Sequence, residues 1–83
     1  MERTPFPRDL LIAQTRATAA YRALAVPRAV HTVALRRALL RWETVVYYHP
    51  YWTTRARGAG GRADLRLAAR AELARHEREG KAA

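Results

Sequence analysis

Arginine dominates the chemistry that this sequence could perform. Nine arginines and a single acid, Glu43, lie between Leu10 and Arg62. A surface with so little opposing charge attracts anions, so its natural partners are nucleic acid, an acidic protein or an anionic membrane surface. Phosphate contacts give affinity for nucleic acid without reading its sequence. The predicted phosphate-binding residues are Arg36, Arg37, Arg41, Arg55, Arg57 and Arg62. The alternative is a solvated basic face without a ligand.

An aromatic cluster follows the first of these arginines, with the order Tyr-Tyr-His-Pro-Tyr-Trp from Tyr47 to Trp52. Aromatic rings beside arginines can stack on the bases of single-stranded nucleic acid. The same residue types anchor protein interfaces. They can also close a corner of the core while their polar ends reach water. Tyr47, Tyr51 and Trp52 are therefore predicted stacking or interface residues, with core packing as the alternative.

Glycines precede the last predicted helix, at Gly58, Gly60 and Gly61. Backbone amides at a helix N-terminus can hold an anion. However, a phosphate-binding loop of the P-loop type needs a preceding strand and a Lys-Ser/Thr ending, and this sequence has neither. We therefore predict a flexible hinge here.

Catalytic and metal chemistry find no support among the remaining residues. The chain has no cysteine and no serine, which removes the common nucleophiles and thiolate metal ligands. The histidines His31, His49 and His76 include no pair at the i,i+4 spacing of a zinc-binding helix. We predict no catalytic residue, no metal site, no cofactor and no enzymatic activity.

Prolines divide the chain into helical segments. Residues 1–7 form an extended lead-in with two prolines, and apolar residues recur at helical spacing over residues 8–25. Pro27 suits the first turn of a second helix over residues 28–48, which ends before Pro50. Residues 49–61 form the aromatic and basic connection, and a third helix follows over residues 62–79, with Gly80 as its terminator.

The second predicted helix is apolar on two sides. A wide arc holds Ala34, Leu35, Ala38, Leu39, Trp42, Val45 and Val46, and a narrower stripe holds Val33, Leu40 and Tyr47. A helix with two apolar sides is usually central. We therefore expect helix 28–48 to lie between the other two helices, or to pair with a second copy of the chain in a homodimer.

The length of 83 residues limits the chain to one small domain with a marginal core. Leu, Ile, Val and Phe together number only 16, which with the net charge of +9 approaches the composition of disordered chains. The helical periodicity favours folding despite this composition. The longest uncharged stretch, Thr44 to Thr54, is too short to cross a bilayer, and no secretory signal precedes the first helix. We expect a cytoplasmic location.

These observations together predict an all-α fold, a helical hairpin with a hinged C-terminal helix. The predicted function is that of a small basic nucleic-acid-binding or accessory protein without enzymatic activity. The alternative is an adaptor that binds an acidic protein through its aromatic and basic corner. A peripheral membrane helix is disfavoured, since helix 28–48 lacks the single clean apolar face that such a segment needs.

Overall fold

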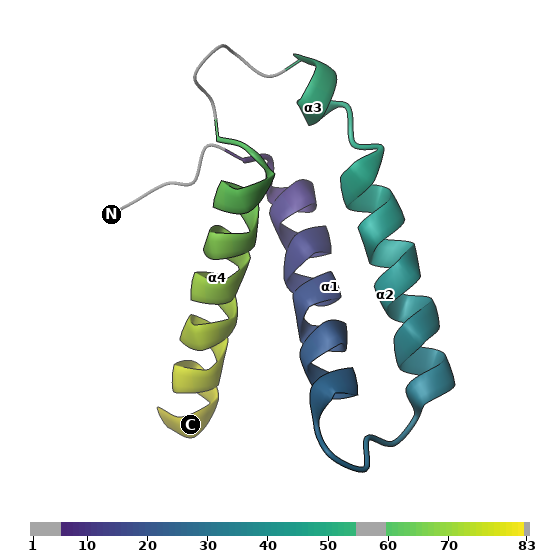
Figure 1. Cartoon of the computed structure of the whole chain (residues 1–83). Helices are drawn as coiled ribbons and strands as arrows, with labels where there is room; N and C mark the ends of the chain where they lie inside the picture. The colour runs from purple at the N-terminus through teal and green to yellow at the C-terminus, as the bar shows by residue number, and fades with distance from the viewer. Residues whose placement is uncertain (1–5, 55–59, 83) are drawn as a thin grey trace.

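The computed structural model describes residues 6–54 and 60–82, and the side chains only as far as residue 80. Its elements are all helical (Figure 1): α1 (Arg8–Ala25), α2 (Thr32–Tyr47), the short α3 (Tyr51–Thr54) and α4 (Arg62–Ala82). The prediction of an all-α fold is confirmed. The long helices α1 and α2 form the antiparallel hairpin, and α4 is the C-terminal helix that follows the connection.

The loop between α1 and α2 is longer than the sequence predicts. Helix α1 has the predicted bounds, and the backbone at Val26, before Pro27, is extended. Helix α2 begins at Thr32 and not at Arg28, so the predicted start is wrong. Arg28 and His31 adopt φ angles of 58° and 57°, in the left-handed region. A right-handed helix cannot continue through such residues.

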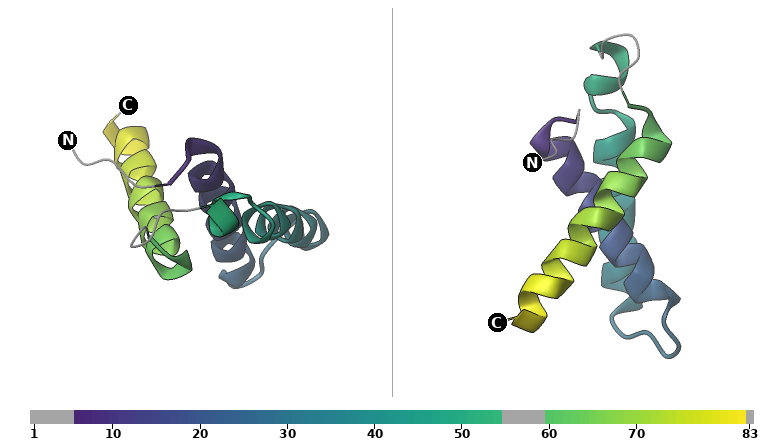
Figure 2. Two further views of the ribbon diagram at one scale, coloured as in Figure 1. Left: turned by 90° about the horizontal axis from the view of Figure 1, so that it is seen from above. Right: turned by 90° about the vertical axis from the view of Figure 1, so that its left-hand side faces the viewer.

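Helix α1 is the central helix, which corrects the prediction that α2 would be. Among the described elements, the backbone of α1 packs against both α2 and α4, whereas the backbones of α2 and α4 do not pack against each other. Figure 2 shows the three long helices side by side, with α1 in the middle. The buried residues of α1 are Leu10, Leu11, Ala13, Thr15, Ala17 and Ala20. The small alanine side chains let the backbones of α2 and α4 approach α1. Helix α1 can therefore pack against a helix on each of two sides although it has few large apolar residues.

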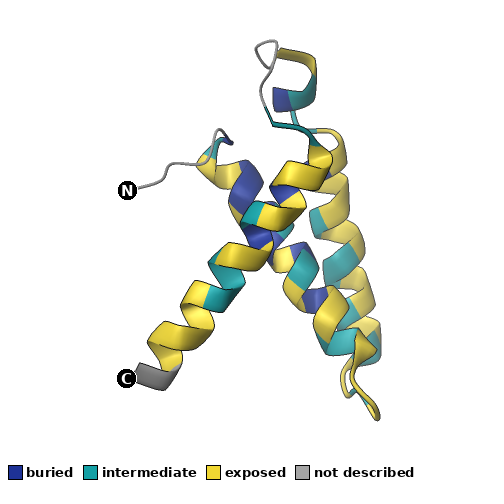
Figure 3. Ribbon diagram, turned by 60° about the vertical axis from the view of Figure 1, so that its left-hand side comes forward, coloured by how far each residue is buried: buried dark blue, intermediate teal, exposed yellow. Residues whose placement is uncertain are grey.

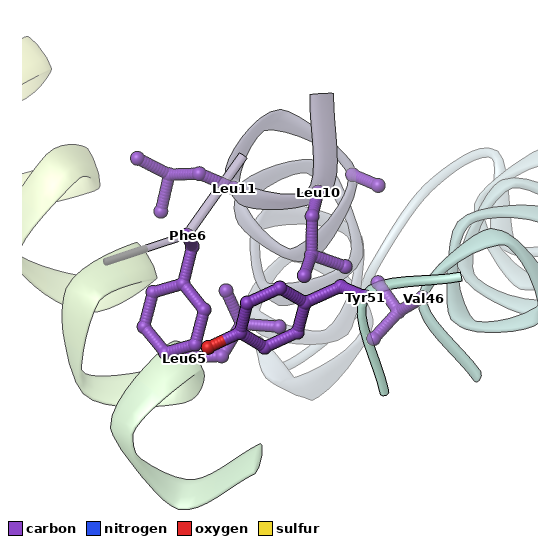
Figure 4. Packing of buried hydrophobic residues seen from close by; sticks show 7 residues of the cluster. Phe6, Leu10, Leu11, Val46, Tyr51 and Leu65 are labelled. Carbon is purple, nitrogen blue, oxygen red and sulfur yellow. The ribbon is translucent and has the colours of Figure 1, made fainter. Parts of the chain in front are cut away.

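The core lies at one end of the molecule, where the start of α1 meets the end of α2, α3 and the start of α4 (Figure 4). Its members are Phe6, Leu10, Leu11, Ala13, Val46, Tyr51 and Leu65. Figure 3 shows that burial decreases away from this end. The helices are therefore packed most closely at this end, and their residues become more exposed toward the loop between α1 and α2.

Helix α4 is held to this corner by few residues. Leu65 and Ala69 are its fully buried side chains. The helix continues through Gly80 to Ala82, so the predicted end at residue 79 is wrong. A helical glycine costs only about 1 kcal/mol relative to alanine, which the end of a helix tolerates. Gly60 has a packing role instead, since a Cβ atom there would lie 2.7 Å from Phe6 Cζ.

The overall shape is a thin layer with principal extents of 43 × 31 × 17 Å. The radius of gyration of 13.9 Å exceeds the value of about 12 Å expected for a globular chain of this length. A single layer of helices leaves apolar side chains on both faces, whereas most domains cover them with a second layer. In the described residues, no helix has the length and apolar content needed to cross a membrane.

Candidate nucleic-acid interface

A groove lies between α2 and α4, with α1 as its floor. Its volume is 470 Å³. Polar and aromatic side chains line it from all three helices, among them Gln14, Thr18 and Tyr21 of α1, Glu43 and Tyr47 of α2, and Arg62, Arg66 and Arg70 of α4. The groove therefore combines three cations, one acid and two tyrosine rings.

One wall of the groove carries the arginine ladder, Arg62, Arg66 and Arg70. Residues four apart lie above one another on a helix, so the three guanidinium groups project from one line about 12 Å long. None of the three forms a salt bridge with the described part of the chain. No acid of the described chain therefore neutralises the ladder through a salt bridge.

The acids in the C-terminal half of α4 are paired. Arg75 donates hydrogen bonds to Glu72 and, at 2.7 Å, to Glu79. The bond from Arg75 lowers the pKa of the Glu72 carboxyl below its usual value, so this group is ionised at neutral pH. Glu77 lies 3.9 Å from Arg22 of α1. The first half of α4, by contrast, carries three arginines and one acid, Asp64, and none of these arginines has a salt bridge to a described residue.

The start of α4 also satisfies its own backbone. The carboxylate of Asp64 accepts a hydrogen bond of 2.9 Å from the Gly61 amide. This amide is therefore occupied within the chain, and Gly61 does not offer it to an anion. The hinge that the sequence predicts falls partly on residues 55–59, which lie outside the described residues.

Arg62 joins the ladder to the predicted aromatic cluster. Its guanidinium carbon lies 5.0 Å from the ring centre of Tyr47 and 4.3 Å from that of Trp52. Cations at these distances are attracted to the faces of aromatic rings. The Trp52 indole donates a hydrogen bond of 2.6 Å to the Val46 carbonyl, which fixes its ring at the C-terminal end of α2. Arg62 is thereby held at the mouth of the groove.

Tyr51 lies in the core, which corrects its predicted role as a stacking residue. Its ring is buried and meets Phe6 edge-on, with the ring centres 5.4 Å apart. Its hydroxyl donates a hydrogen bond of 3.1 Å to the Gly60 carbonyl. The alternative of core packing is therefore right for this ring, while Tyr47 stays exposed and Trp52 is half-buried.

The predicted arginines of α2 do not line the groove and do not share one side of their helix. Arg36, Arg37 and Arg41 are exposed and have no salt bridge to any described residue. At 100° per residue, however, Arg36 and Arg41 point about 140° apart around the helix. Arg41 instead shares the Trp42 ring with Arg16, at 5.2 and 4.9 Å from the ring centre.

The remaining predicted residues, Arg55 and Arg57, lie outside the described residues. Arg66 and Arg70, by contrast, line the groove but were not predicted. The signal for them was their i,i+4 spacing after Arg62. The acid-poor span on which the prediction rested ends at Arg62, because Asp64 follows it, so Arg66 and Arg70 fell outside that span.

His49 has a structural role at the same corner. Its Nδ1 accepts a hydrogen bond of 3.1 Å from the Tyr51 amide, so its Nε2 carries the proton and donates to Asp9 Oδ2 at 3.1 Å. This bond is the main cause that lowers the pKa of Asp9. Among the described residues, no group of histidines and acids could hold a metal ion.

The chain matches no protein-family model, no curated protein and no solved structure. Its function is therefore inferred from its own residues.

Proposed function

We propose that this chain is a small cytoplasmic protein without enzymatic activity that binds nucleic acid through its arginine ladder. The observation that carries the proposal is the lack of salt bridges at Arg62, Arg66 and Arg70 in the described chain, next to acids that are paired elsewhere on α4. Guanidinium groups along one groove wall suit a row of phosphates. Such contacts bind nucleic acid of any sequence.

The tyrosines beside the ladder support a single-stranded ligand. Tyr21 and Tyr47 line the groove and are exposed, so their rings can receive unstacked bases. Arg62 already lies over the Tyr47 ring. A strand whose phosphates follow the ladder would have aromatic surface within reach on the opposite wall.

Titration of labelled single-stranded DNA or RNA at increasing salt tests this proposal. If three ladder arginines contact phosphates of a single strand, log K should fall linearly with log salt with a slope of about −2. Further contacts by Arg36, Arg37 or Arg41 would make the slope steeper. Absence of salt-sensitive binding near physiological ionic strength would reject the proposal.

A second candidate function is that of an adaptor for an acidic protein. It is favoured by the exposed apolar side chains of α2, such as Val33 and Leu40, for which phosphates offer no partner. Acidic peptides with apolar residues would satisfy both these side chains and the arginines. Recovery of protein partners from lysate that survives nuclease treatment would support the adaptor over the nucleic-acid-binding protein.

A further inference from the structure

An apolar stripe runs along the outer side of α2. Its members, Val33, Leu40 and Tyr47, are 60%, 70% and 63% exposed. The backbones of α2 and α4 do not pack against each other, and among the described residues of α4 Arg62 reaches the stripe, at its Tyr47 end, while Val33 and Leu40 stay exposed. A row of three large apolar residues on a helix that packs on one side only is a surface for another helix.

The stripe is symmetric about Leu40. Val33 lies seven residues before it and Tyr47 seven residues after it, about 10.5 Å along the helix in each direction. We propose that α2 pairs with α2 of a second copy of the chain, antiparallel and with a two-fold axis at Leu40. This pairing places Leu40 against its own copy and Val33 against Tyr47 of the second copy.

Charge complementarity supports this partner and this direction. Arg36 lies four residues before Leu40 and Glu43 three residues after it. At 100° per residue, both lie about 40° to 60° from the stripe, on the same side. An antiparallel two-fold axis keeps residues on their side of the interface, so Arg36 meets Glu43 of the second copy at a height difference of about 1.5 Å. The pair forms twice.

The pairing explains the one acid in the basic span. Glu43 is exposed and has no salt bridge within the described chain. A parallel pairing would exchange the sides and place Arg36 against Arg37 of the second copy. Charges beside the apolar seam decide helix orientation in this way, and the like charges disfavour the parallel form.

The geometry also relates the dimer to the groove, and this step rests on the proposed function. Glu43 and Tyr47 line the groove, so the side of the stripe that holds Arg36 and Glu43 is the groove side. The two-fold axis preserves that side. The dimer would then open both grooves on one face, where one nucleic-acid strand could engage two arginine ladders and stack its bases on Tyr21, since Tyr47 lies in the dimer interface.

A charge exchange tests the pairing without nucleic acid, so its failure is separate from failure of the proposed function. The interface is one helix wide and therefore small, so the dimer should be weak. We expect the wild-type chain to dimerise at micromolar concentrations. Arg36→Glu and Glu43→Arg each place like charges across the interface. Each variant alone should dimerise about tenfold more weakly in sedimentation equilibrium. An equimolar mixture of the two should form a heterodimer, because both of its pairs have opposite charges.

Arg37→Glu is the matched control, since it makes the same charge change one residue away on the other side of the stripe. Its mixture with Glu43→Arg should not recover the wild-type affinity. All three positions are exposed, and circular dichroism should show unchanged helix content. A wild-type chain that stays monomeric at hundreds of micromolar, or equal recovery by both mixtures, would overturn the proposal.

Discussion

Two leucines on α4 differ in burial and provide a direct test of how this helix is held. Leu65 is 0% exposed and Leu67 is 61% exposed. Leu65 is one of the few side chains that fix α4 to α1, and truncation of a buried leucine to alanine costs about 2 to 5 kcal/mol. A chain of this length has a total stability of only about 4 to 12 kcal/mol. Leu65→Ala should therefore remove a large part of it.

The control is Leu67→Ala, which makes the same chemical change two residues away and should alter stability by no more than about 0.5 kcal/mol. Urea unfolding followed by circular dichroism measures both. In thermal unfolding, Leu65→Ala should lower the melting temperature by about 10 °C or more, and Leu67→Ala by a few degrees at most. Equal effects of the two substitutions would refute the packing of α4 through Leu65.

Three further predictions concern individual contacts. The pKa of Glu72 is lowered by Arg75, so the stability from this pair is present above the carboxyl's usual value of 4.5 and is lost as pH falls through the lowered value. Glu72→Gln should therefore flatten the loss of stability in urea titrations below about pH 4.5. His31→Gly should raise stability by up to about 1 kcal/mol, whereas His31→Val should lower it, because the residue has a left-handed backbone. Tyr51→Phe should cost about 1 kcal/mol through the lost bond to Gly60.

The helices themselves were largely predictable from the sequence. Pro7 and Pro27 bracket α1, whose bounds agree with the prediction. The late start of α2 was not predictable, because Arg28 and His31 carry no local signal for a left-handed backbone. Glycine or asparagine at these positions would have indicated a left-handed backbone, whereas arginine and histidine do not.

The order of the helices was harder to predict than their existence. Helix α2 carries the larger apolar residues, so the sequence favoured it as the centre. The structure places α1 there, because Ala13, Ala17 and Ala20 allow close approach. A search for hydrophobic periodicity gives large apolar side chains the most weight. It therefore gives too little weight to a helix face of alanines, which packs well because its side chains are small.

The candidate site was predicted only in part. Arg62 and Tyr47 were predicted and do lie together at the groove. Arg66 and Arg70 were missed because the acid-poor span that predicted the site ends at Arg62, and acids follow from Asp64 onward. The structure separates the paired half around Arg75 from the unpaired half. Opposite charges on a helix neutralise each other when they are three or four residues apart and in contact. The net charge of the helix does not show which charges are paired in this way.

The most direct test of nucleic-acid binding by the arginine ladder compares two double variants of α4. The first variant combines Arg66→Ala with Arg70→Ala, and the second combines Arg75→Ala with Arg78→Ala. Each variant removes two positive charges from the same helix. The first should weaken binding to all sequences alike and make the salt slope shallower by about 1.4 to 1.8. The second should change the slope little, since Arg75 is engaged with Glu72 and Glu79 and neither Arg75 nor Arg78 lines the groove. Equal losses for both variants would mean that net charge alone attracts the ligand, and would contradict a binding site at the ladder.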